Sequence, residues 1–360
     1  MPRNSKRRIP AQYLPILILL TLVTLFTSCA RGEVSLKPAA VYPVHTQLQK
    51  AYLLDDAANI LLYADGTKEK SHPLPVTLDL SGISEEYTEI EYCESADFHD
   101  SFYAKIQDGY AQIYNLKTGA VYYYRGVSKK GKGTTLAFKT EEALPRNLMI
   151  EGVTNARDLG GYQTPMGKIK QGMLYRTARL NQNKAASPSP IITENGISTM
   201  LDNLNIKTEI DLRRTSDNEI GSLTASVLGE TVNYHNCPMV SSSDMLTANN
   251  DSIRKVFSLL AEEKNYPLFY HCSIGTDRTG YISFLILSLL GVARDDVYRD
   301  YLFSDFASIG SERTILNVAG FSFFLSLKPG NTPAEQAENF LLEIGVTKEE
   351  IQSVRRILIE

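Results

Sequence analysis

Ten consecutive residues between two apolar runs limit most strongly what this chain can fold into. They read His-Cys-Ser-Ile-Gly-Thr-Asp-Arg-Thr-Gly and occupy positions 271–280. A short apolar run, 267–270, precedes them, and a long one, 281–292, follows. That order predicts a strand, a tight loop and a buried helix. A loop so placed turns backbone N–H groups inward at a helix N-terminus, which is a ready binding site for an anion.

Two side chains of this loop suit phosphoryl transfer. A free thiol has a pKa of roughly 8.5, so only a small fraction is ionised at neutral pH. The dipoles of the helix N-terminus favour the thiolate of Cys272. Arg278 carries a planar fork of N–H donors that fits two oxygens of one phosphate. The loop therefore predicts a nucleophilic sulfur facing a bound phosphate.

The decapeptide resembles the signature loop of the protein tyrosine phosphatase superfamily, His-Cys-x5-Arg-Ser/Thr. Its ending is similar to that of a bacterial branch of tyrosine and lipid phosphatases. Other segments resemble further elements of this branch, in the same order along the chain: Asn155-Ala-Arg-Asp-Leu-Gly-Gly-Tyr162, Leu174-Tyr-Arg-Thr177, Ile210-Asp-Leu-Arg213 with Glu219, and Asp300-Tyr-Leu302. The resemblance covers residues 145–360. It implies an α/β fold with a tyrosine-phosphatase-like central sheet flanked by helices.

The chemistry divides the site residues into three groups. Cys272 would attack phosphorus, while Arg278 and the loop amides hold the phosphate oxygens, and Thr279 would donate its hydroxyl to the sulfur. The residues expected to surround the phosphate are Ser273, Ile274, Gly275, Thr276, Asp277 and Arg278. The residues expected to support the loop are His271, Asn155, Arg157 and Asp158.

Two aspartates compete for the proton-transfer role. A phosphatase of this kind needs a group that protonates the leaving oxygen and then activates water. The resemblance implies Asp277, inside the loop. Asp211, which follows a predicted strand, is the rival, and its alternative role is to orient the loop through hydrogen bonds.

One position departs from the pattern of the branch. Lysine usually precedes the Asp-Arg pair, and here Thr276 stands in its place. Phosphate capture by Arg278 is unaffected. One cation fewer at the mouth of the site predicts weaker binding of substrates with several phosphates, and thus a preference for phosphotyrosine over phosphoinositides.

Composition narrows the classes of function. A net charge of −4 argues against a nucleic-acid partner. The five histidines are scattered and lack the spacing of metal ligands, so neither a metal nor another cofactor is expected. The leading hypothesis is a cysteine-dependent phosphatase that acts on phosphotyrosine, with phosphoserine and phosphothreonine as further candidate substrates. The alternatives are a phosphoinositide or inositol-phosphate phosphatase and a non-catalytic phosphate-binding lipoprotein.

The N-terminus reads as a targeting segment. Basic residues near the start precede an apolar stretch, 14–26, that is too short to span a bilayer. It ends in Leu-Phe-Thr-Ser-Cys29, which resembles a bacterial lipoprotein signal. This predicts a signal peptide over 1–28, a lipid on Cys29, and a protein exported to the bacterial cell envelope and anchored in a membrane. An ordinary secretory signal with an incidental cysteine is the alternative.

Between the anchor and the loop domain the pattern is strand-like. After a tether over 29–40, residues 41–142 show short alternating segments separated by turn residues, which predicts an all-β sandwich. Residues 115–119 with Tyr122 resemble a corner of fibronectin type III domains. The partner of this domain is not indicated. Since every candidate catalytic residue lies in 145–360, a fragment that starts near residue 143 is expected to fold and to hydrolyse an aryl phosphate.

Overall fold

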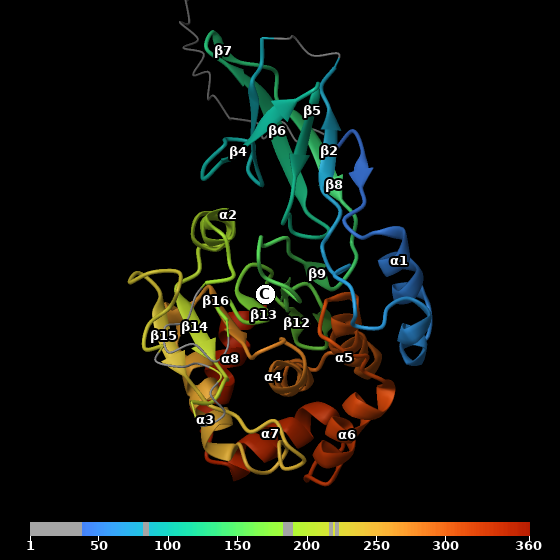
Figure 1. Ribbon diagram of the computed structural model, residues 1–360, viewed down its shortest axis with the longest axis vertical. Coiled ribbons are helices and arrows are strands. Elements are labelled where there is room, and N and C mark those ends of the chain that lie inside the picture. Colours follow the sequence, from blue (N-terminus) through green and yellow to red (C-terminus); the bar gives the residue numbers. More distant parts are fainter. Residues whose placement is uncertain (1–37, 82–85, 183–189, 216–218, 220–222) are drawn as a thin grey trace, which may run out of the picture. The chain divides into compact units, whose positions relative to one another are not determined.

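The computed structural model describes residues 38–360 apart from 82–85, 183–189, 216–218 and 220–222 (Figure 1). The predicted signal peptide, Cys29 and most of the tether lie outside the described residues. None of the helices in the described part of the chain is long and apolar enough to cross a membrane.

The C-terminal part contains a six-stranded mixed sheet. Its strands, in spatial order, are β15 (Asn233–Asn236), β14 (Thr208–Asp211), β16 (Leu268–His271), β13 (Leu174–Thr177), β10 (Arg157–Asp158) and β9 (Arg146–Asn147). The first four are parallel, and β10 and β9 run antiparallel to their neighbours. His271 pairs with both Asp211 and Thr177, so the carboxyl ends of three strands meet at one edge. Segments that follow these strands therefore converge there.

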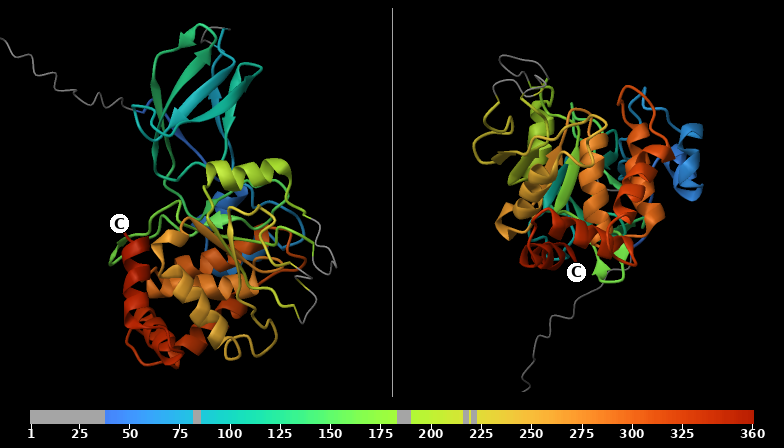
Figure 2. Two further views of the ribbon diagram at one scale, coloured as in Figure 1. Left: turned by 90° about the vertical axis from the view of Figure 1, so that its left-hand side faces the viewer. Right: turned by 90° about the horizontal axis from the view of Figure 1, so that it is seen from below.

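Helices pack beside this sheet (Figure 2). They are α2 (Glu194–Ser198), α3 (Asn250–Leu260), α4 (Asp277–Leu289), α5 (Arg294–Leu302), α6 (Ile315–Ser326), α7 (Pro333–Glu343) and α8 (Lys348–Leu358). Helix α4 contacts α5 and α7, and its residues 278–289 are all buried. The run that follows the decapeptide is therefore a core helix, as its apolar composition predicted. The smaller β11 (Gln163–Thr164) and β12 (Gly167–Lys168) form a separate two-stranded sheet.

A second sheet lies in the N-terminal part. Its strands are β1 (Val41–Tyr42), β2 (Val76–Asp79), β3 (Glu89–Cys93), β4 (Phe102–Gln107), β5 (Tyr110–Ile113), β6 (Val121–Ser128), β7 (Gly131–Lys132) and β8 (Leu136–Thr140). Strand β4 pairs with β3 and then, through Ile106 and Gln107, with β5. Apolar side chains from β2, β3, β5, β6 and β8 form one buried cluster. In the predicted corner, the hydroxyl of Tyr122 accepts a hydrogen bond from the Lys117 N–H, at 2.9 Å.

The prediction that 41–142 contains strands only is wrong for its first third. Helix α1 (Gln47–Leu54) and the 3₁₀ helix η1 (Ala57–Leu62) lie there. Tyr52 is fully buried, with its ring 6.3 Å from that of Phe303 and 5.7 Å from that of Phe306. Eight residues are too few to show a helical period, but the capping box that begins at Thr46 was a readable signal.

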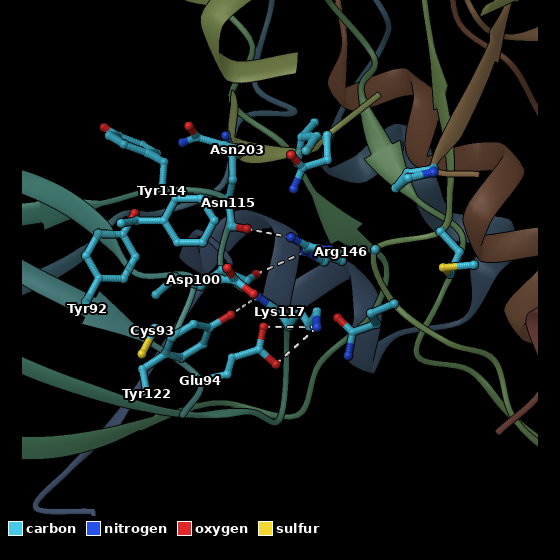
Figure 3. A pocket seen from close by; sticks show the side chains of 18 of the residues that line it. Tyr92, Cys93, Glu94, Asp100, Tyr114, Asn115, Lys117, Tyr122, Arg146 and Asn203 are labelled. Carbon is cyan, nitrogen blue, oxygen red and sulfur yellow. Dashed lines mark hydrogen bonds and ion pairs between the residues drawn. The ribbon is translucent and has the colours of Figure 1, made fainter. Parts of the chain in front are cut away.

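Arg146 connects the two sheets. Its guanidinium donates to the Asp158 carboxylate, at 2.6 Å, and to the backbone carbonyls of Asn115 and Leu116. Figure 3 shows Arg146 and Asn115 beside a cavity of about 420 Å³ that Tyr92, Tyr114 and Tyr122 also line. No residue of the decapeptide lines this cavity. The described residues pack as one compact unit, and buried contacts of Arg146 and Tyr52 cross the expected boundary at 142–145.

We expect Tyr52→Ala to lower the free energy of unfolding by about 3–5 kcal/mol, because it removes a buried aromatic ring from the core around Phe303. Chemical denaturation of the protein would measure this. Leu54→Ala on the same helix is the control, since Leu54 is 90% exposed and should change stability by less than about 0.5 kcal/mol. Equal effects of the two substitutions would contradict the packing of α1. For the same reason, a fragment that starts at residue 143 is now expected to be unstable.

Candidate active site

The decapeptide forms the strand, loop and helix that its sequence predicts. Strand β16 ends at His271 and helix α4 begins at Asp277. The loop lies against the end of β13, and Gly275 has a φ of +71°. A Cβ atom on Gly275 would lie 2.6 Å from the carbonyl oxygen of Thr177. Only glycine satisfies both the backbone angle and this close approach.

Donors from the segment before β10 and from β13 hold the back of the loop. The Asn155 side-chain amide donates to the carbonyls of Ile274, at 3.1 Å, and Gly275, at 3.0 Å. Arg176 donates to the same Gly275 carbonyl at 2.7 Å. The carbonyl and the N–H of a trans peptide point in opposite directions. Fixing these carbonyls therefore turns the N–H groups of residues 275 and 276 toward the other side of the loop.

A buried carboxylate anchors those donors. Asp300 accepts from Arg157 at 2.8 Å and from Arg176 at 2.6 Å, and all three side chains are at most 1% exposed. Arg157 also donates to the side-chain oxygen of Asn155. Burial raises the pKa of Asp300, but the two arginines lower it by more than burial raises it. The pKa therefore lies below its ordinary value. The segments that the resemblance identified separately thus meet behind the loop.

Glu219 holds the arginine of the loop. Its two carboxylate oxygens accept from Arg278 at 2.6 and 2.7 Å, and it also accepts from the hydroxyl of Ser273. Burial raises the pKa of Glu219, and the hydrogen bonds from Arg278 and Ser273 lower it to about 2. The guanidinium of Arg278 is therefore oriented before any substrate binds. The sequence placed Glu219 within the element that begins with Ile210-Asp-Leu-Arg213, but it did not predict that Glu219 binds Arg278.

Asp277, the first residue of α4, is held by a residue far along the chain. Arg313 donates to its two oxygens, at 2.8 Å each, and the Tyr301 hydroxyl donates at 3.0 Å. Burial raises the pKa of Asp277, but the bonds from Arg313 bring it below its ordinary value. The Asp277 side chain is 34% exposed. No motif in the sequence indicated Arg313.

The other aspartate, Asp211, is enclosed. It is fully buried, binds Arg213 through both oxygens and accepts from the Tyr234 hydroxyl at 3.1 Å. Burial raises its pKa, while the charges of His271 and Arg213 lower it to below the ordinary value. These bonds fit a structural role for Asp211 at the end of β14, although they go to Arg213 and Tyr234 and not to the loop that Asp211 was expected to orient.

His271 is fixed on both sides. One ring nitrogen lies 2.9 Å from Glu209, and the other lies 3.3 Å from the carbonyl oxygen of Cys272. Glu209, Asp211 and His271 are close enough together to hold a metal ion. Each already has protein partners, however, and Ser226 donates to the remaining oxygen of Glu209. The cluster is explained by hydrogen bonding within the protein, so it is not assigned as a metal site.

Two residues lie differently from expectation: Asp158, expected to support the loop, and Thr276, expected beside the phosphate. Asp158 does not contact the loop, because neighbouring residues of a strand point to opposite faces, and it binds Arg146 and the N–H groups of Gly160 and Gly172 instead. Thr276 is fully buried and accepts from Asn155. Its side chain faces the support of the loop, and the effect of position 276 on the choice of substrate stays a prediction.

The two remaining loop residues with predicted roles are also buried. Cys272 is 2% exposed, and its thiol is free. Thr279 is fully buried, and its hydroxyl has no hydrogen-bond partner among the described residues. The ten residues 271–280 therefore carry the thiol of Cys272, the guanidinium of Arg278 and the carboxylate of Asp277.

Solved structures and curated proteins share limited similarity with this chain. The catalytic core of the PP-IP phosphatase Siw14 from S. cerevisiae is 14% identical over 46% of this chain and 85% of that one, with a TM-score of 0.30. TpbA from P. aeruginosa, in complex with pTyr, is 16% identical over 49% and 88%, with a TM-score of 0.31. Likeness at this level adds nothing to the description of the fold.

The curated relatives are closer in sequence. A protein of Cupriavidus necator named as a tyrosine-protein phosphatase is 26% identical over 185 residues, and a tyrosine-protein phosphatase of Nostoc commune is 25% identical over 199. These matches cover 44% and 42% of this chain and 63% and 66% of the relatives' own lengths. Residues 148–360 match the tyrosine phosphatase family, nearly the range that the motifs predicted. The chain therefore belongs to the tyrosine phosphatase family.

Proposed function

We propose that this protein is a cysteine-dependent phosphatase that hydrolyses phosphotyrosine monoesters through a cysteinyl-phosphate intermediate. One observation carries the proposal: Cys272 and Arg278 share a loop between β16 and α4, and Glu219 holds the guanidinium of Arg278 in place. Family membership supports the same reaction class.

The first half-reaction forms a sulfur–phosphorus bond. The Cys272 thiolate attacks phosphorus, and the bond to the leaving oxygen breaks with its electron pair on that oxygen. Arg278 and the loop amides stabilise the charge on the other three oxygens. In the second half-reaction water displaces the sulfur, and the hydroxyl of Thr279 stabilises the departing thiolate.

Asp277 is the better candidate for proton transfer. It lies inside the loop, and about a third of its side chain is exposed. Both aspartates have both oxygens hydrogen-bonded within the protein, but Asp211 is fully buried, so only Asp277 has surface that a substrate or water can approach.

A phosphoinositide or inositol-phosphate substrate is the second candidate. A cavity of about 280 Å³ beside the loop is lined by Ser273, Ile274, Arg179 and His72 among others. Arg179 would offer a cation to a second phosphate, whereas Glu69 in the same lining would oppose it. The mixed charge makes this substrate class second to phosphotyrosine.

Our proposal also covers where the enzyme acts and what its N-terminal part resembles. A lipid on Cys29 would anchor it in a membrane of the bacterial cell envelope, where a phosphorylated protein or phospholipid is its substrate. The strand-rich segment resembles a fibronectin type III domain, which the Tyr122–Lys117 hydrogen bond supports. A partner for that segment is not identified.

We expect Cys272→Ser to lower turnover of a phosphotyrosine peptide by on the order of 10⁴-fold or more, because it removes the nucleophile. Binding of inorganic phosphate, measured by calorimetry, should persist, since Arg278 and the loop amides remain. Cys93→Ser is the matched control, because Cys93 is a buried thiol outside the site. Wild-type turnover by the Cys272→Ser variant would rule out the covalent mechanism.

The substrate class is tested with the same pair of proteins. A phosphotyrosine peptide, a phosphoserine peptide and a phosphoinositide should be compared by kcat/KM. The proposal expects the phosphotyrosine peptide to be the best of the three. A higher kcat/KM for the phosphoinositide would favour the second candidate, and phosphate binding without turnover of any substrate would indicate a non-catalytic protein.

Cys29→Ala should move the exported protein from the membrane fraction to the soluble fraction or block cleavage of the signal, because it removes the site of lipid attachment. Fractionation and metabolic labelling with a fatty acid would measure this, with Cys93→Ser as the control. If the wild-type protein is cleaved but carries no lipid, the N-terminus is an ordinary secretory signal and the proposed anchor is wrong.

A further inference from the structure

We propose that the N-terminal sheet and a helical segment of the catalytic part form a binding cleft for a neutral oligosaccharide. The sheet contributes the outer face of β4 and β5, and the helical segment is α2 with the π helix η2 (Thr199–Asn203). The lining of the cleft includes no residue of 271–280, so its ligand would be distinct from the phosphatase substrate.

The cleft is a cavity of about 820 Å³. Residues of β4 and β5 line it together with Asn195 of α2 and with Thr199 and Asn203 of η2. Its volume lies in the range of about 300–1,000 Å³ that is usual for ligand sites. Tyr114 and Asn203 also line the cavity of about 420 Å³ in Figure 3, so the two cavities adjoin each other.

The strand face that borders the cleft carries exposed tyrosine rings. Residues alternate along β5, where Ala111 and Ile113 are buried, whereas Tyr110 is 46% exposed. Tyr103 of β4 is 53% exposed, and Tyr114, just after β5, is 38% exposed. All three tyrosines line the cleft. The solvent face of an antiparallel sheet normally carries polar side chains, so packing of the core does not explain this concentration of aromatic surface.

Uncharged amides lie among these rings. Gln107 pairs directly with Tyr110 across β4 and β5, and Gln112 follows on the same face of β5. Neither these two side-chain amides nor that of Asn203 has a hydrogen-bond partner among the described residues. A side-chain amide both donates and accepts hydrogen bonds, which suits a hydroxyl group. The cleft therefore offers unused amides next to exposed rings.

Rings and amides together match the chemistry of a sugar. A sugar ring presents C–H groups on its two faces and hydroxyl groups around its rim. Tyrosine gives a rigid apolar surface on which the C–H face packs, at a low cost in side-chain entropy. Tyr110 and Tyr114 are four residues apart along β5 and the residue after it, which corresponds to about 13 Å. A ligand that packs on both rings must contain more than one sugar.

The charges of the cleft favour a neutral ligand. Of its lining residues in the described part of the chain, Lys105 is cationic, whereas Asp108 and Glu151 are anionic. The carboxylate of Glu151 also accepts a hydrogen bond from Asn195, at 3.0 Å. A phospholipid headgroup, a nucleotide or an acidic polysaccharide would therefore meet more negative than positive charge here.

The adjoining cavity and the thiol lie at opposite ends of the central sheet. Met173 and Pro267, which immediately precede β13 and β16, line that cavity. Cys272 follows the other end of β16. A bound oligosaccharide would therefore leave the catalytic loop open to a phosphorylated substrate, and the cleft would hold the enzyme on a glycan.

The first test is a binding screen with purified full-length protein. The probes are neutral oligosaccharides of glucose, mannose, galactose, xylose or N-acetylglucosamine, compared with the free monosaccharides, with heparin and with phosphatidylglycerol vesicles. We expect at least one oligosaccharide to bind with a Kd between about 1 μM and 1 mM in calorimetry, and its monosaccharide to bind more weakly. If no neutral oligosaccharide binds, or if only the anionic probes bind, the proposal is wrong.

The second test asks whether the bound oligosaccharide occupies the cleft. Tyr110→Ala and Tyr114→Ala should each weaken its binding by on the order of tenfold, because each removes a ring from the lining. Gln112→Leu keeps the size of the side chain but removes its amide, and it should weaken binding as well. Phe323→Ala is the control, since Phe323 is 69% exposed on α6 and lines neither cavity. Unchanged affinity in both tyrosine variants would overturn the proposal.

Folding and catalysis are followed in parallel. The substituted side chains are exposed, so the unfolding midpoint and the turnover of an aryl phosphate should stay at wild-type values in every variant. Added oligosaccharide should leave turnover unchanged, whereas competitive inhibition would place the ligand at the catalytic loop and overturn the proposal. Because binding is measured directly, a protein without phosphatase activity would contradict the proposed function alone, and the binding data would still decide the cleft.

Discussion

Asp300 lies in a part of the core that is closed to water and shares its carboxylate between Arg157 and Arg176. Buried charges are tolerated only when they are paired and hydrogen-bonded, so each member of this triad requires the other two. Arg176 reaches the loop directly, and Arg157 reaches it through Asn155. The shape of the loop around Cys272 therefore depends on an ion cluster that contacts no substrate.

Two further carboxylate–arginine pairs preset the charges of the loop. Glu219 holds Arg278, which would bind phosphate, and Arg313 holds Asp277, which would transfer a proton. In each pair the geometry is bidentate, so the side chains need little rearrangement when charge develops on a substrate. Preorganised charges of this kind are the usual source of large rate accelerations.

The N-terminal part is joined to the catalytic part by the same kinds of contact. Tyr52 packs on Phe303, and Arg146 spans from the Asn115 carbonyl to Asp158. The Gly66 carbonyl binds the turn that leads to Arg313. Residues between β1 and β2 thus contribute to the surroundings of the candidate site. A division of the chain near residue 143 therefore separates contacts that belong together.

The sequence by itself determined the strand, loop and helix around Cys272 and the family of the chain, because these follow from local spacing and from residue types that suit phosphate. The alternating pattern also predicted that 41–142 is rich in strands, and the apolar run after the loop predicted the buried helix α4. Only the tertiary structure decided that Asp158 faces Arg146, that Thr276 is buried, and that Arg313 binds Asp277. These contacts join residues that are distant in sequence, and their pairing is set by how buried surfaces and charges fit together, which local spacing does not encode.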